Sequence, residues 1–361
     1  MRIAFIGVRG VPARYSGFET CVEQVGRRLA DRGHTVTVFC RAAHYPDRPD
    51  TFAGMRMRYM PAIRGKHLET ISHTALTAAR CGDQDAIVCM GVGNAPVVRV
   101  LDATGRRTVF NVDGADWQRD KWGAAASTYL RVAEVLAAHS RSVLVADAAT
   151  VARHYRERFS RDTEFVPYGA EPPADTGTAV LDDLRLGPAG YALFVGRLEP
   201  ENGAHDFLEG CRLAGPEIAA VVVGDAVYPG AYTRDLRAGA PGQAVFAGFR
   251  FGAPYQQLTA HARVFVLAAT VGGTHPVLLE QMAAGNCILA RDTPSNREVL
   301  GDAGLWWRTP AELAERLHES WDDAPVRAEL GARARARQLA TYDWEAVTSR
   351  YEQLCAEVSR R

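Results

Sequence analysis

The chain has 361 residues, which is long for one domain and sufficient for two, each able to bury its own core. Lysine plus arginine equals aspartate plus glutamate, 42 each, so no global charge favours a nucleic-acid partner. The seven cysteines form no C-x-x-C pair, which argues against zinc, iron–sulfur and thioredoxin-like sites and predicts buried thiols in a reducing compartment.

The first half of the chain alternates apolar strands with helices. It opens with a strand at Ile3–Ile6 and a glycine-rich loop from Gly7 to Gly17. A helix with apolar residues at a spacing of three or four follows, and Gly33 is predicted to end it in a left-handed conformation. Further buried parallel strands are predicted at Thr35–Cys40, Ala86–Met90, Thr108–Val112 and Ser142–Ala146.

A second series of strands and helices follows a polar, proline-containing connection at Glu171–Gly177. Its strands are predicted at Tyr191–Val195, Ala219–Val223, Ala244–Phe246, Val264–Leu267 and Cys287–Ala290. An amphipathic helix from Trp344 to Val358 closes the chain. We therefore expect an α/β protein with two doubly wound sheets, divided into 1–170, 171–343 and a C-terminal helix at 344–361 that packs back toward the first domain.

The first loop, G-V-R-G-V-P-A-R-Y-S-G-F-E, lies between a strand and a helix, where backbone amides and the helix dipole favour an anion. It lacks the G-x-G-x-x-G dinucleotide spacing, and the second strand ends at Cys40-Arg41 without a carboxylate for a ribose. A nicotinamide enzyme is therefore disfavoured. The alternative is a long turn that needs its glycines only for backbone conformation.

Two segments of the second half suit a sugar nucleotide. Arg197 follows a strand, where a guanidinium can hold a diphosphate bidentately. The segment Gly272–Gly285 places paired glycines and Pro276 at the start of a helix, where the amides of Val277, Leu278 and Leu279 can receive phosphate oxygens. Glu280, one turn further on, is placed to accept hydrogen bonds from sugar or ribose hydroxyls. The alternative is a capped helix with a surface glutamate.

These residues together resemble the retaining GT-B glycosyltransferases, and among them the bacterial rhamnosyltransferase-like enzymes. The resemblance covers nearly the whole chain and is carried by the first loop, by D-G-A-D-W-Q-R-D-K-W from Asp113 to Trp122, and by G-G-T-H-P-V-L-L-E from Gly272 to Glu280. It implies a GT-B fold, two Rossmann-like domains facing across a cleft, with the donor bound mainly by the second.

The resemblance also implies roles for individual residues. Arg197 is similar to the family's diphosphate-binding arginine, Glu280 to its ribose-binding glutamate, and Gly17 to the glycine near the donor phosphates. The segment Gly248, Phe249, Arg250 and Phe251 resembles the loop that lines the base pocket. Asp113 stands where such enzymes keep a His or Asp beside the reacting sugar, and acceptor-side candidates are Phe18, Glu19, Trp117, Arg119, Lys121 and Trp122.

Two positions depart from the family pattern. The first of its two glutamates falls at Gly272, so the contact with the donor sugar comes from Thr274 or His275 or is missing. Asn202 replaces a lysine of the phosphate site. Asp113 remains open between a catalytic residue and a turn-forming Asp-Gly, and the Trp117–Trp122 segment between an acceptor surface and plain core.

The expected activity is transfer of a hexosyl or deoxyhexosyl group, rhamnosyl included, from a dTDP- or UDP-linked donor to a hydroxyl of a glycan, lipid-linked sugar or small glycoside. No cofactor and no metal are expected, because no D-x-D pair suits a divalent ion. A two-Rossmann sugar-nucleotide epimerase and a non-catalytic nucleotide-sugar-binding protein are the alternatives. No apolar run reaches the roughly 20 residues of a spanning helix, so a cytoplasmic location is expected, with peripheral contact at the inner face of a membrane left open.

Overall fold

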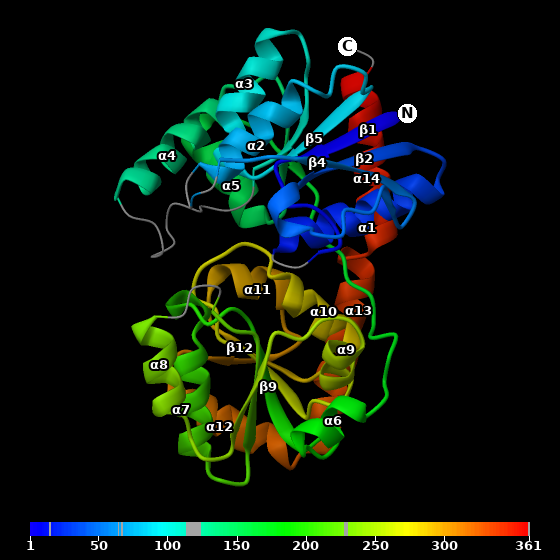
Figure 1. Ribbon diagram of the computed structural model, residues 1–361. Coiled ribbons are helices and arrows are strands. Elements are labelled where there is room, and N and C mark those ends of the chain that lie inside the picture. The colour runs from blue at the N-terminus through cyan, green and yellow to red at the C-terminus, as the bar shows by residue number, and fades with distance from the viewer. Residues whose placement is uncertain (14–15, 64, 66–67, 113–123, 227–229, 360–361) are drawn as a thin grey trace. The chain divides into compact units, whose positions relative to one another are not determined.

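The computed structural model describes residues 1–13, 16–63, 65, 68–112, 124–226 and 230–359 (Figure 1). The chain forms two compact units, one of Met1–Tyr168 together with Trp344–Arg361 and the other of Gly169–Asp343. Each unit contains one sheet, and helices connect its parallel strands. The predicted fold class, two Rossmann-like α/β domains, is confirmed.

The sheet of the first unit has the strand order β3-β4-β2-β1-β5-β6-β7-β8, and only the β3–β4 pair is antiparallel. Its strands are β1 (Arg2–Ile6), β2 (Thr35–Arg41), β3 (Thr51–Phe52), β4 (Met55–Met60), β5 (Ala86–Met90), β6 (Val109–Asn111), β7 (Val143–Ala146) and β8 (Glu164–Phe165). The α-helices described in this unit are α1 (Gly17–Asp31), α2 (Glu69–Ala78), α3 (Ala95–Ala103), α4 (Ala124–Ala138), α5 (Ala149–Phe159) and α14 (Trp344–Ser359).

The central strands of this sheet are the ones that the apolar runs predict. β1 and β5 are buried almost throughout because helices cover both faces of a parallel sheet. β4 was not predicted, since arginines alternate with its buried methionines and the segment lacks an apolar run. Gly33 has φ 86°, the left-handed conformation predicted for the residue that ends α1.

The second unit has a six-stranded parallel sheet in the order β11-β10-β9-β12-β13-β14. Its strands are β9 (Tyr191–Val195), β10 (Ala219–Val223), β11 (Ala244–Gly248), β12 (Val264–Leu267), β13 (Ile288–Arg291) and β14 (Leu305–Trp307). Its α-helices within the described ranges are α6 (Ala179–Leu184), α7 (Ala204–Ala214), α8 (Ala231–Ala238), α9 (Ala253–Ala260), α10 (Pro276–Ala284), α11 (Pro294–Leu300), α12 (Pro310–Trp321) and α13 (Ala324–Thr341).

All seven cysteines are buried and free, as the sequence predicts for small core side chains. In the part of the chain that the structure describes, every helix is too short or too polar to cross a lipid bilayer.

The C-terminal helix α14 completes the first unit by packing against α1, β5 and β6 (Figure 1). Its apolar face is buried, with Tyr351 and Leu354 at 1% and 0% exposure. Tyr351 also accepts a hydrogen bond from the Asn111 amide at the end of β6, 3.0 Å away. A helix that follows the whole second unit, Gly169–Asp343, in sequence is therefore part of the core of the first unit.

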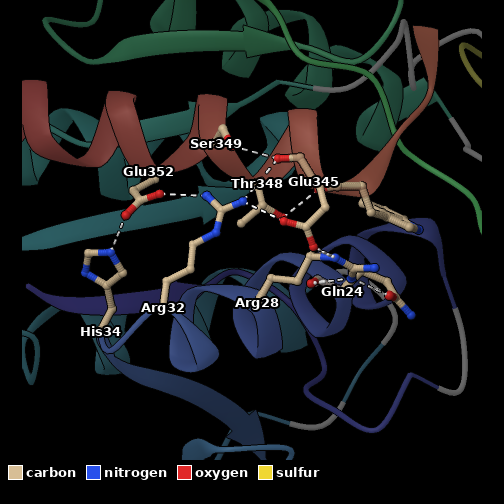
Figure 2. Close-up of polar contacts among 9 residues, drawn as sticks. Gln24, Arg28, Arg32, His34, Glu345, Thr348, Ser349 and Glu352 are labelled. Atoms are coloured by element: carbon tan, nitrogen blue, oxygen red, sulfur yellow. Dashed lines mark hydrogen bonds and ion pairs between the residues drawn. The ribbon is translucent and has the colours of Figure 1, made fainter. Parts of the chain in front are cut away.

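A polar network joins α14 to α1 and to His34, which follows α1 (Figure 2). Arg32 donates to both Glu345 and Glu352, each at 2.7 Å, and Arg28 donates to Glu345 at 2.9 Å. The His34 ring lies 2.6 Å from the second oxygen of Glu352. The hydrogen bonds from His34 and Arg32 hold the pKa of Glu352 below its usual range.

We expect Glu352→Gln to lower the free energy of unfolding of the first unit by about 1 kcal/mol at pH 7, since charged hydrogen bonds at a partly exposed site are lost. A carboxylate with a depressed pKa stabilises the fold above its unfolded pKa, and this contribution is lost as the pH falls through the folded pKa. Urea denaturation should therefore show that the wild type has the larger free energy of unfolding at pH 7, and that its difference from Glu352→Gln becomes smaller in acid. Glu357→Gln on the same helix is the control, because Glu357 lies 4.0 Å from Arg350 and outside the network. If Glu352→Gln and Glu357→Gln lowered the free energy of unfolding equally, the stabilising role of Glu352 in this network would be contradicted.

Candidate functional site

The strand order of the second unit brings two of the predicted segments together. From β9 the chain moves to β10 and β11 on one side, then returns to β12 on the other side of β9. The carboxyl ends of β9 and β12 therefore flank the point where the strand order reverses, which is where open α/β sheets bind ligands. The loop with Arg197 follows β9, and the loop with Gly272 and His275 follows β12.

These two loops are bonded to each other. The Thr270 amide and hydroxyl both donate to the Glu201 carbonyl, at 3.0 and 3.2 Å. Gly203 has φ 73°, and a Cβ there would lie 2.4 Å from the Ala268 carbonyl oxygen. A side chain at position 203 would clash with this carbonyl, so glycine is what allows the two loops to approach closely.

Arg197 lies two residues beyond β9, with its side chain about one quarter exposed. Its Nη1 is 3.4 Å from Glu199 Oε1, so a carboxylate neighbours the guanidinium. Asn202, predicted to bind the diphosphate, donates its side-chain amide to the Arg197 carbonyl at 2.9 Å. Asn202 thus holds the backbone that carries the arginine.

The start of α10 corrects the prediction for its amides. The Leu278 and Leu279 N–H groups donate to the His275 carbonyl at 2.9 and 3.4 Å, so both already have an acceptor in the first turn. The Val277 N–H, next to Pro276, has no acceptor among the backbone groups of the described residues. Of the three predicted amide donors, Val277 is the one left for a ligand, together with the positive end of the helix dipole.

The backbone conformation at position 272 favours glycine over the glutamate that the family resemblance implies. Gly272 has φ 142°, and a Cβ at this position would lie 2.7 Å from Cε1 of the His275 ring. The imidazole therefore occupies the space in which a side chain at 272 would begin. His275 is the residue before α10, half-buried, while Thr274 beside it is 6% exposed.

Glu280 lies in the middle of α10 and is half-buried. The phenolic hydroxyl of Tyr255 on α9 donates a hydrogen bond to Glu280 Oε2. Burial raises the pKa of Glu280, and the hydrogen bond from Tyr255 acts in the opposite direction. Tyr255 was not among the predicted residues, because it is 25 positions away in sequence and only the packing of two helices brings it here.

The segment predicted to line the base pocket follows β11 at the same edge of the sheet. Phe249 and Phe251 are 47% and 56% exposed, and their rings stack with centroids 6.2 Å apart. Arg250 lies between them in sequence, with a buried Nε that has no partner in the described structure. Gly248, at φ 69°, joins this segment to the neighbouring loop by accepting a hydrogen bond from Gly224. Two exposed aromatic rings at a ligand-binding edge can stack on a planar base.

The site residues predicted in the first unit differ in where the structure places them. Gly17 begins α1, and the Phe18 ring lies over Gly91, where a Cβ would be 3.4 Å from its Cε2. Glu19 is 1% exposed, so the structure places it in the interior and not on a surface open to an acceptor. The remaining predicted residues, Asp113, Trp117, Arg119, Lys121 and Trp122, lie outside the described residues.

Within the described ranges, no three His, Cys, Asp or Glu side chains converge as a metal site would require. The segments that follow β9, β11 and β12 carry, respectively, a guanidinium, two exposed aromatic rings and the amino terminus of α10, with the Glu280 carboxylate one turn into that helix. This set of groups can bind a diphosphate, a polyol and a planar base side by side.

Two family models match the chain, one for each sheet. Residues 16–169 match the model described as "Glycosyl transferase 4-like domain", and residues 189–323 match "Glycosyl transferases group 1". No curated protein matches the chain significantly.

Solved structures share the fold over the full length. HepE from Anabaena, solved in complex with UDP-glucose, is 19% identical with a TM-score of 0.80, and all of both chains is covered. Sucrose-phosphate synthase from Thermosynechococcus elongatus is 19% identical with a TM-score of 0.80, covering 99% of this chain and 98% of the other. WaaG, a glycosyltransferase of lipopolysaccharide biosynthesis, is 16% identical with a TM-score of 0.73, covering 97% and 98%. With its glycosyl transferase 4-like and group 1 domains on the GT-B fold, the protein is a glycosyltransferase.

Proposed function

We propose that the protein transfers a hexosyl or deoxyhexosyl group from a nucleoside diphosphate sugar to an acceptor hydroxyl. One observation carries this proposal: the strand order of the second unit brings the loop with Arg197 and the amino terminus of α10 to the same edge of the sheet, and Glu280 follows one turn into α10. In the proposed complex the guanidinium and the Val277 amide meet the diphosphate, Glu280 accepts from the ribose, and Phe249 and Phe251 stack on the base.

The chemistry breaks the bond between the anomeric carbon and the diphosphate oxygen and forms a bond from that carbon to the acceptor oxygen. Negative charge grows on the departing diphosphate, so the positive groups already held beside it stabilise the transition state. We propose retention of configuration, with the acceptor attacking from the face that the diphosphate leaves. The acceptor proton then passes to a diphosphate oxygen, and no metal is needed. Were the reaction to invert, Asp113 would be the general base.

For the donor we propose a UDP- or dTDP-linked sugar. HepE was solved with UDP-glucose, which supports a uridine nucleotide, and the resemblance to rhamnosyltransferase-like enzymes supports a dTDP-linked rhamnose. His275 occupies the space beside Gly272 and is proposed to contact the sugar in place of the family glutamate. The proposed acceptor is a glycan, a lipid-linked sugar or a small glycoside bound by the first unit, in polysaccharide or glycoconjugate synthesis in the cytoplasm.

Calorimetric titration with UDP, dTDP, GDP and ADP, alone and as sugar conjugates, tests this proposal. We expect one nucleotide to bind, and the sugar to appear on an acceptor hydroxyl when acceptors are added. Release of an isomerised sugar without an acceptor would identify an epimerase instead. Binding without turnover on any acceptor panel would favour a non-catalytic sugar-nucleotide-binding protein.

Glu280→Ala should weaken nucleotide binding by about 10- to 100-fold, because hydrogen bonds to a charged carboxylate contribute about 1.5–3 kcal/mol. The loss should be the same for the free nucleoside, since the carboxylate is proposed to contact the ribose and not the phosphates. Calorimetry measures both affinities. Glu329→Ala, an exposed glutamate on α13, is the control. Unchanged nucleoside affinity in Glu280→Ala would remove the ribose assignment.

A further inference from the structure

Tyr255 forms a hydrogen bond with the Glu280 carboxylate. It lies in the first turn of α9, after Gly252, which has φ 60°, and its hydroxyl donates to Glu280 Oε2. Among the described residues the other oxygen, Oε1, has no protein hydrogen-bond partner. One carboxylate oxygen is therefore fixed, and the other remains available to a ligand.

We propose that Tyr255 is a positioning residue that orients the Glu280 carboxylate to accept a hydrogen bond from a ribose hydroxyl of the donor. This inference rests on the proposed function, because it needs Glu280 to bind the ribose. It adds a residue that does not touch the donor itself. Its role is to fix the rotation of the carboxylate before the donor arrives, so that less side-chain freedom is lost on binding.

A buried polar network also joins α9 to α10. Gln281 donates to the Thr259 hydroxyl at 3.1 Å, and Asn286 donates to Gln281 Oε1 at 2.6 Å and to the Thr259 carbonyl at 2.9 Å. Thr259 and Gln281 also lie within reach of the Tyr255 oxygen and act to lower its pKa. A buried network with its members paired is rigid, so it fixes the helix that carries Tyr255 against the helix that carries Glu280.

Electrostatics favours the same role. Burial, followed by the negative charge of Glu280, raises the pKa of Tyr255 well above its usual value, so the phenol stays protonated as a donor. Its hydrogen bond counters the rise that burial causes in the pKa of Glu280 and so favours the ionised carboxylate, the stronger acceptor.

Tyr255→Phe is the test, with Tyr191→Phe as its matched control. Tyr191 is buried in the same unit and donates to the Leu258 carbonyl of α9 at 2.7 Å, so its loss removes a structural hydrogen bond from the same helix. The probes are UDP or dTDP, whichever binds the wild type more tightly, and the 2′,3′-dideoxy form of that nucleotide. Thermal denaturation establishes that each variant is folded.

The wild type should bind the dideoxy nucleotide about tenfold more weakly, the typical effect of one lost hydrogen bond to a charged group. Tyr255→Phe should reduce the affinity for the parent nucleotide about fivefold and shrink the dideoxy penalty to about twofold, because a misdirected carboxylate no longer distinguishes the hydroxyls. Tyr191→Phe should keep the full penalty. In a Glu280→Ala background, Tyr255→Phe should have no further effect.

An unchanged dideoxy penalty in Tyr255→Phe, with Glu280→Ala still impaired, would overturn this inference and leave the proposed function standing. An additive effect of Tyr255→Phe in the Glu280→Ala background would overturn it as well. If Glu280→Ala and removal of the hydroxyls both left affinity unchanged, the ribose assignment would fail and this inference with it.

Discussion

Replacing Arg197 by alanine should weaken binding of the nucleoside diphosphate by about 10- to 100-fold, since charge-assisted hydrogen bonds contribute about 1.5–3 kcal/mol. Turnover should fall further, by about 10²- to 10³-fold, because the diphosphate gains negative charge as the sugar leaves. Removal of the Arg197 side chain would also leave the Glu199 carboxylate without its ion-pair partner, so that its negative charge would repel the phosphates. Calorimetry and initial-rate measurements give the two quantities.

Two substitutions sharpen this experiment. Arg197→Lys keeps the positive charge but loses the planar guanidinium that can bind a phosphate bidentately. Relative to Arg197→Ala, it should therefore recover part of the affinity for the nucleoside diphosphate and little of the transfer rate. Arg212→Ala removes an exposed arginine that pairs with Glu209 on α7 and should change neither quantity. Affinity for the free nucleoside should be equal in wild type and Arg197→Ala. A loss of nucleoside affinity as large as that for the diphosphate would show that Arg197 does not act on the phosphates.

Asp113→Asn should slow transfer by about 10²- to 10⁴-fold, the range of a positioned acid–base group, while donor affinity stays within about twofold of the wild type. Asparagine has the same shape but no charge, so it removes the proposed stabilisation of positive charge on the sugar, or the proton acceptor if the reaction inverts. Single-turnover kinetics with saturating donor isolate the chemical step.

Asp116→Asn is the matched control in the same segment and should leave the rate of transfer unchanged. Full activity in Asp113→Asn would end its catalytic assignment and favour the turn-forming interpretation of the Asp-Gly pair. Lowered donor affinity with an unchanged chemical step would instead assign Asp113 to donor binding.

The two-sheet architecture could be predicted because the buried strands are apolar runs bounded by turns. Tyr191–Val195 and Ala219–Val223 begin and end where the sequence pattern places them. The adjacency of the Arg197 and Gly272 loops also follows from general principle, since ligand loops of such sheets lie at the carboxyl ends of the strands. β4 could not be predicted because arginines interrupt its apolar residues, and β14 could not be predicted because its three residues are too few for a recognisable apolar run.

The finer geometry of the site depends on contacts that no linear pattern contains. Asn202 was predicted to bind the diphosphate, yet its side-chain amide donates to the Arg197 carbonyl, because the short turn at Pro200–Asn202 brings the two residues together. The amides of Leu278 and Leu279 are used by the His275 carbonyl, a detail of how the first turn of α10 closes. Tyr255 reaches Glu280 only through the packing of α9 on α10.

A crystal structure of the protein with the nucleoside diphosphate that binds most tightly tests the central claim most directly. The account predicts phosphate oxygens within hydrogen-bond distance of the Arg197 guanidinium and the Val277 amide, and a ribose hydroxyl on Glu280 Oε1. A diphosphate bound elsewhere, with Arg197 still beside Glu199 and Glu280 contacting only Tyr255, would contradict it.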